Sequence, residues 1–124
     1  MKNITIAVET ITLAAQLNDS ETAQKVWEAL PIEGSANTWG DEIYFSIPVA
    51  LDQAPDAQAE VEIGTLGYWE PGQAFCIFYG QTPASTGEKP RAASPVNIFG
   101  RVLDDATQLR GVRSGARVKV TQAD

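Results

Sequence analysis

The side chains best suited to chemistry lie in Asn37–Pro48, in Ile63–Gly80 and in the segment that follows them. Aromatic rings can form a flat apolar floor there, while an acid, an arginine and hydroxyls can fix a polar group, as in small-molecule and peptide pockets. The predicted ligand-binding residues are Glu42, Tyr44, Tyr68, Trp69, Phe78, Arg91 and Ser94. The alternative is that Trp69 and Phe78 pack in the interior and that Arg91 only solvates a loop.

Residue types that the chain lacks exclude several kinds of site. There is no histidine, and Cys76 is the one cysteine. This excludes a Ser-His-Asp triad, a Cys-His pair, an internal disulfide and a zinc site built from His or Cys. No glycine-rich phosphate loop precedes a helix. We therefore predict no metal and no cofactor, and we interpret Cys76, inside the apolar stretch AFCIFYG, as a buried hydrophobe.

Acidic residues near predicted turns offer another chemistry, because a pair of carboxylates can catalyse hydrolysis. These residues are Asp41, Glu42, Glu62 and Glu70. The sequence does not give the separation between them, and acids beside turns are usually solvated. A carboxylate-based hydrolase stays one of the alternatives.

Length and composition predict a single folded domain over residues 1–124, since 44% of the residues are hydrophobic and 20% are charged. No apolar run is long enough to span a membrane, and Met1–Leu17 lacks the pattern of a secretory leader. We expect a cytoplasmic protein with no membrane partner.

Charge is spread unevenly along the chain, whose net charge is −7. Residues 1–88 carry 2 basic and 13 acidic side chains, whereas residues 89–124 carry 7 basic and 3 acidic ones. Such asymmetry can mark a nucleic-acid surface, but a folded domain can also bring the two halves together so that their charges pair. Because the whole chain is acidic, we predict no nucleic-acid partner.

Alternation of apolar and polar residues predicts short strands throughout the chain. In residues 42–47, Ile43, Phe45 and Ile47 share one face, and Glu42, Tyr44 and Ser46 share the other. Residues 74–79 are apolar on both faces, as in a strand buried on both sides. The expected strands are 3–8, 11–15, 37–39, 42–47, 59–63, 74–79, 96–103 and 116–121.

Helices, turns and one long loop connect these strands. Capping residues at 18–21 and Pro31 bound a helix over residues 20–30, and a second short helix is expected at 104–110. Pro71-Gly72 predicts a type II turn, and residues 81–95 lack periodicity and are expected to form a loop. The fold class predicted from this tally is mainly β, a closed eight-stranded antiparallel barrel with two short capping helices.

Three long motifs make a family resemblance specific. They are NTWGDEIYFSIP (Asn37–Pro48), VEIGTLGYWEPGQAFCIFYGQTPAS (Val61–Ser85) and RAASPVNIFGRV (Arg91–Val102). In this order they resemble the small prokaryotic cyclophilin-like family, a minimal version of the cyclophilin barrel whose members are mostly of unknown function. The resemblance covers essentially the whole chain and implies an eight-stranded antiparallel barrel capped by helices.

The resemblance does not carry prolyl isomerase activity with it. In true cyclophilins an arginine after a Phe-His pair donates a hydrogen bond to the prolyl nitrogen. The corresponding stretch here, GDEIYFSIP, has neither His nor Arg. We therefore expect a module that binds a small molecule or a proline-containing peptide without turnover. The alternative is a divergent peptidyl-prolyl isomerase in which Arg91 is the catalytic donor.

Overall fold

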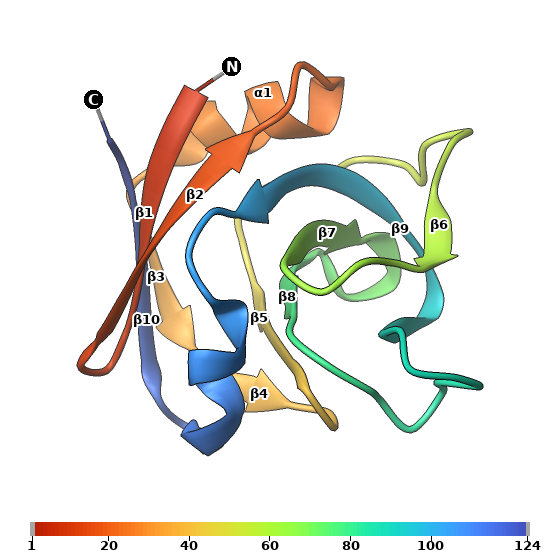
Figure 1. Cartoon of the computed structure of the whole chain (residues 1–124). Helices are drawn as coiled ribbons and strands as arrows, with labels where there is room; N and C mark the ends of the chain where they lie inside the picture. The colour runs from red at the N-terminus through yellow and green to blue at the C-terminus, as the bar shows by residue number, and fades with distance from the viewer. Residues whose placement is uncertain (1, 124) are drawn as a thin grey trace.

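Ten strands pair antiparallel in one curved sheet in the computed structural model, which describes residues 2–123 (Figure 1). The order of neighbours is β3-β10-β1-β2-β9-β7-β8-β5-β4, and β6 pairs with β9 beside this path. The strands are β1 (Lys2–Val8), β2 (Ile11–Leu17), β3 (Ile32–Ser35), β4 (Asn37–Thr38), β5 (Glu42–Ser46), β6 (Gln58–Glu60), β7 (Thr65–Trp69), β8 (Ala74–Phe78), β9 (Arg91–Val102) and β10 (Arg117–Gln122). The helices are α1 (Glu21–Ala29) and the 3₁₀ helices η1 (Glu70–Gly72) and η2 (Ala106–Gly111).

The expectation of a mainly β, antiparallel fold is confirmed, but the closed eight-stranded barrel is wrong. The path of nine strands ends at β3 and β4 and does not return on itself, and with β6 the sheet has ten strands. The sequence pattern does not predict β3, in which Gly34 interrupts the alternation, or β7, which has four consecutive buried residues. Both strands are short and lack the two-residue period by which a half-buried strand is recognised.

The two short helices expected from the sequence are an α-helix and a 3₁₀ helix. Helix α1 lies across the upper end of the sheet in Figure 1, and the Ser20 hydroxyl caps it by accepting a hydrogen bond of 3.1 Å from the Ala23 N–H. Ala23 and Val26 bury its apolar face. The second expected helix is the 3₁₀ helix η2. It begins after Asp105, whose side chain accepts from the Thr107 N–H.

Two apolar clusters lie on opposite faces of the sheet around β8. Successive residues of a strand point to opposite faces, so Phe75 and Ile77 enter the main core while Cys76 and Phe78 enter a second, smaller cluster. All five residues of β8 are buried, which confirms the strand predicted to be covered on both sides. The second cluster consists of Val61, Ala74, Cys76, Phe78, Ala92 and Val96.

Strand β9 covers this second cluster, and its first half corrects the loop predicted over residues 81–95. The strand starts at Arg91, so that Arg91 and Ser94 are strand residues. Pro95 and the small residues around it hide the strand in the sequence. The pairing with β6 shifts register between Gln58↔Val96 and Glu60↔Arg91, and such an irregularity tolerates a proline that has no N–H to donate.

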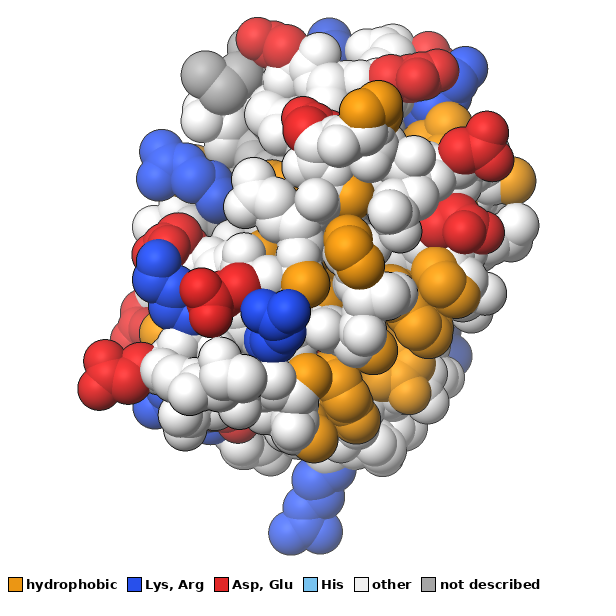
Figure 2. Space-filling view, turned by 90° about the vertical axis from the view of Figure 1, so that its right-hand side faces the viewer, with side chains coloured by type: hydrophobic (Ala, Val, Ile, Leu, Met, Phe, Trp, Pro, Cys, Tyr) orange, Lys and Arg blue, Asp and Glu red, His pale blue; other side chains and the backbone are white. Residues whose placement is uncertain are grey.

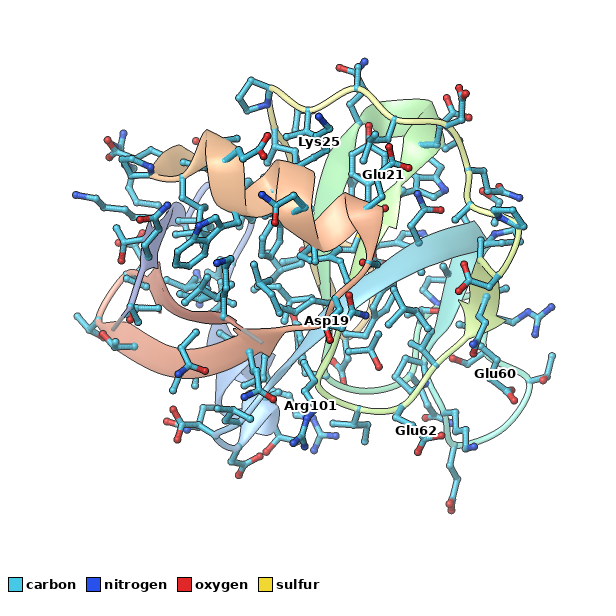
Figure 3. The ribbon with its side chains drawn as sticks, turned by 90° about the horizontal axis from the view of Figure 1, so that it is seen from above. Asp19, Glu21, Lys25, Glu60, Glu62 and Arg101 are labelled. Atoms are coloured by element: carbon cyan, nitrogen blue, oxygen red, sulfur yellow. The ribbon has the colours of Figure 1, made fainter. Side chains whose placement is uncertain are left out.

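Folding brings the basic last third of the chain against the acidic part. Ion pairs join Lys89 to Glu62 at 2.7 Å, Arg110 to Asp41 at 3.2 Å, and Arg117 to Glu33 at 3.1 Å. Figure 3 shows Glu60 and Glu62 pointing outward along the edge near β6. Basic residues of the last third of the chain therefore pair in the folded protein with acidic residues of the preceding part. No helix within residues 2–123 is long and apolar enough to cross a membrane.

Candidate functional site

A pocket of about 210 Å³ lies over the second cluster. The turn between β4 and β5, the strand β5, the end of β7 and the start of β9 supply its walls. It is lined by Trp39, Glu42, Tyr44, Trp69, Ala92 and Ala93. Three aromatic rings, two methyl groups and one carboxyl group therefore surround a small space.

Strand β5 places Glu42 and Tyr44 on the same wall, because residues two apart in a strand share a face. Glu42 is opposite Phe78 and Tyr44 is opposite Cys76 in the pairing with β8. This is the polar face of the strand predicted from the alternation. Its other face, with Ile43, is in the main core, so the packing of the core holds the wall in place.

The turn before β5 fixes Trp39 at the mouth of the pocket. The Trp39 N–H donates to the Glu42 carbonyl oxygen at 3.0 Å. Gly40 follows with φ +61, and a Cβ there would lie 2.8 Å from the Thr82 Cα. Only glycine meets both conditions without strain.

Trp69 is held by two contacts on its indole ring. The Nε1–H donates to the Ser94 Oγ at 2.8 Å. The ring also packs over Gly72, where a Cβ would come within 2.9 Å of ring carbons. The type II turn predicted at Pro71-Gly72 is wrong, since Gln73 takes the left-handed backbone with φ 46 and η1 precedes it. Glycine is needed at position 72 because any side chain there would collide with the Trp69 ring.

Replacing Gly72 with alanine is expected to displace the Trp69 indole and to cost about 1 kcal/mol of stability, roughly one hydrogen bond. The indole N–H signal of Trp69 in NMR should then shift in the same direction as in Ser94→Ala, which removes the acceptor directly. Gly87→Ala is the matched control, because a Cβ at Gly87 meets nothing within 4 Å. An unmoved indole signal in Gly72→Ala would contradict this account of the turn.

Glu42 is the charged residue of the pocket lining, and only 5% of its surface is exposed. Burial raises the pKa of its carboxyl from 4.5 to about 7, and a hydrogen bond with the Cys76 thiol opposes this rise only in part. The Cys76 Sγ is also 3.8 Å from the Ala74 carbonyl oxygen. A thiol has one proton and an ionised carboxylate is the stronger acceptor, so we assign that proton to Glu42 when Glu42 is ionised.

The carboxyl therefore changes charge near neutral pH, while Cys76 and Tyr79 beside it stay neutral there. Burial, and then the nearby charge of Glu42, raise the pKa of the Cys76 thiol. Burial, followed by the charges of Asp41 and Glu42, raises the pKa of Tyr79 to about 12. In the range from pH 6 to 8 the ionisation next to this pocket is that of Glu42.

The structure brings together five of the residues predicted for the site. Glu42, Tyr44 and Trp69 line the pocket, Ser94 holds the Trp69 indole, and Phe78 lies beneath them in the second cluster.

Tyr68 faces the opposite way. It is buried in the main core, where its hydroxyl donates to the Val49 carbonyl oxygen at 2.6 Å and accepts from the Leu51 N–H at 3.2 Å. Neighbours along a strand point to opposite faces, so Tyr68 and Trp69 cannot both line this pocket.

Arg91 lies on β9, half-buried and opposite Glu60 of β6, and it is not among the side chains that line the pocket. Sequence reasoning missed Trp39, Ala92 and Ala93. Trp39 directly precedes the predicted Gly40-Asp41 turn, which is the signal that places it beside Glu42 and Tyr44.

The paired carboxylates expected of a hydrolase are not found in the lining, where Glu42 is the one acid. Asp41 pairs with Arg110 and Glu62 pairs with Lys89. Glu70 is exposed on η1. The arrangement suits binding in an apolar pocket more than a reaction between two carboxyl groups.

Comparison with known protein families assigns nearly the whole chain to one of them. The sequence profile described as Cyclophilin-like matches residues 2–121. The chain belongs to the cyclophilin-like family. The expectation drawn from the motifs at residues 37–48, 61–85 and 91–102 is therefore confirmed.

A solved structure agrees with this assignment. The cyclophilin-like chain is similar to the solution structure of the hypothetical protein AF2241 from Archaeoglobus fulgidus, with 38% sequence identity and a TM-score of 0.82. The match covers 98% of this chain and 95% of that one. No curated protein matches the chain. Function therefore has to be argued from the pocket itself.

Proposed function

We propose that this cyclophilin-like domain binds a small molecule, or one side chain of a peptide, in the pocket between β5, β7 and β9, without chemical turnover. The observation that carries the proposal is the lining itself: aromatic rings and methyl groups around a single buried polar group. Few, precisely placed polar groups in an apolar concavity are usual for ligand sites. The volume of about 210 Å³ is below that of drug-sized pockets and suits a compact group.

Binding is favoured over isomerase chemistry by the position of Arg91. Prolyl isomerisation of the cyclophilin type needs a positively charged side chain that donates a hydrogen bond to the prolyl nitrogen of the bound substrate. Among the described residues that line the pocket there is no Arg or Lys. Arg91 is next to Ala92 in the chain, but it lies opposite Glu60 in the strand pairing.

The three tryptophans provide a direct test by NMR, because each indole N–H gives its own signal. Trp39 and Trp69 line the pocket, whereas Trp27 lies on α1, where Lys2 is 5.0 Å from its ring centroid. We expect a library of small fragments to include binders that move the Trp39 and Trp69 signals and leave the Trp27 signal in place.

Trp39→Ala should weaken those binders at least tenfold, and Trp27→Ala is the matched control that should not. A library in which every hit moves the Trp27 signal, or no indole signal at all, would contradict the proposal. Exchange NMR on an Ala-Pro peptide with catalytic amounts of protein is the second arm. Uncatalysed exchange takes tens of seconds or longer. Acceleration that Arg91→Ala abolishes would replace binding by isomerase activity.

A further inference from the structure

The charge and the aromatic walls of the pocket restrict what kind of ligand fits. We propose that its occupant is a compact cationic group, an alkylated ammonium head, held between the rings of Trp39, Tyr44 and Trp69 and opposite the Glu42 carboxylate. This inference rests on the proposed function, since it names the chemical class of ligand for the same pocket.

The aromatic walls favour a cation over a neutral group of the same shape. The faces of tryptophan and tyrosine rings carry partial negative charge, and they attract alkylammonium groups most strongly where water is excluded. Three such rings come from three separate segments, the β4–β5 turn, β5 and β7, so more than one wall of the pocket is aromatic. A group covered with methyls also fills this apolar space without leaving polar atoms unpaired.

The Glu42 carboxylate selects against anions, and the apolar lining selects against sugars. An anionic group would be placed beside a buried negative charge, which opposes its binding. A sugar would bring many hydroxyls, but the lining offers few partners for them, because the Trp69 N–H is already donated to Ser94. Hydroxyls that lose water against the apolar walls without gaining partners are costly.

Burial of the carboxylate also explains why a cation gains more than it would at the surface. Glu42 is 5% exposed, and its side-chain partner is the neutral thiol of Cys76. An ionised carboxylate in this setting lacks a compensating charge. A cationic head supplies that charge within the pocket, and the pair forms where screening by solvent is weakest.

Figure 2 shows the side of the molecule that carries β6 and the segment after β8. Hydrophobic side chains gather in its centre and toward the lower right, and charged side chains lie at the left, at the top, at the upper right and at the bottom.

The pH dependence of binding gives a signature with a definite sign. The titratable groups that interact with Glu42 are Cys76 on β8 and Tyr79 just after it. Tyr44 shares the wall with Glu42, and Asp41, the preceding residue in the chain, is paired with Arg110. Cys76 and Tyr79 stay neutral near pH 7, so the charge that changes is that of Glu42. A cation needs the ionised carboxylate, and its affinity is therefore expected to increase about tenfold from pH 6 to pH 8.

The experiment compares choline with its neutral isostere 3,3-dimethylbutan-1-ol, in which carbon replaces the charged nitrogen. Titrations of the full chain, followed by the Trp39 and Trp69 indole signals, should give affinity for choline at least about tenfold higher than for the isostere at pH 8. Glu42→Gln should reduce this preference to the part that the aromatic rings supply, and it should remove the pH dependence. Glu70→Gln, at an exposed acid on η1, should keep both. An unchanged Trp27 signal verifies that each variant is folded.

Three outcomes would overturn the inference. The first is equal affinity for choline and its isostere, unchanged in Glu42→Gln. This result would exclude a preference for a cation, but the pocket would still bind a ligand and the proposed function would stand. The second is an affinity for choline that decreases from pH 6 to pH 8. It would mean that the protonated Glu42 carboxyl donates a hydrogen bond to a neutral acceptor on the ligand. Absence of any shift with choline at pH 8 would also overturn it, and the fragment screen would then decide separately whether the pocket binds ligands.

Discussion

Glu42→Gln is expected to stabilise the protein at pH 8 and to leave its stability almost unchanged at pH 5. In the unfolded chain Glu42 ionises near pH 4.5, but in the folded protein it ionises only near pH 7. Between these values the unfolded chain binds fewer protons, so the free energy of unfolding decreases as pH rises. Above pH 7 Glu42 is ionised in both the folded and the unfolded protein, and the decrease in the free energy of unfolding is complete. Below pH 4.5 Glu42 is protonated in both states, and the free energy of unfolding is not decreased.

The expected size of this effect is about 2–3 kcal/mol between pH 5 and pH 8, as one pKa unit corresponds to about 1.4 kcal/mol. Glutamine has nearly the same shape and carries no charge, so the variant should not show this loss. Urea unfolding of both proteins at the two pH values measures the difference. Glu70→Gln is again the control, and it should keep the pH dependence of the wild type. A Glu42→Gln protein that loses stability as steeply as the wild type would mean that the carboxyl is solvated.

Phe75→Ala is expected to destabilise the protein by about 3–5 kcal/mol, the usual result of removing a large ring from a packed core. Its ring stacks on Phe45 with centroids 5.1 Å apart and meets the edge of Phe99 at 5.0 Å. No part of Phe75 is exposed. The cavity left behind would lie between two rings that are themselves fixed by strands β5 and β9.

Denaturant unfolding at a single pH measures this loss, and Phe75→Leu should recover a large part of it by refilling the space. Because Phe75 points away from the pocket, a Phe75→Leu protein should still bind fragments with wild-type affinity. A loss below about 1 kcal/mol in Phe75→Ala would show that the three rings do not form the centre of the core.

Strand positions followed from the sequence wherever one face is apolar and the other polar. Residues 42–47 are the clearest example, since Ile43, Phe45 and Ile47 lie in the main core as predicted. The start of β9 could not be found in this way. Its residues Arg91–Pro95 are small or polar and include a proline, and they are strand only because β6 and the second cluster lie against them.

The site was predictable in composition but not in orientation. Glu42, Tyr44 and Trp69 could be chosen by residue type. Tyr68 has the same type of side chain as Tyr44, but it faces the core. Which of two adjacent residues lines a pocket depends on strand register, and a shift of one residue reverses every side chain. That register is set in part by pairing between distant segments, such as Tyr68↔Asn97, which no local pattern contains.

Strand β8 contributes alternate residues to the main core and to the second cluster under the pocket. Its odd-numbered residues 75 and 77 belong to the main core, and its even-numbered residues 74, 76 and 78 form the floor under the pocket. A change at an even position alters the shape or polarity of the floor while the core packing persists. If the pocket binds a ligand as proposed, relatives with the same backbone can diverge in ligand choice by substitutions at every second residue of one strand, without first acquiring compensating mutations in the core.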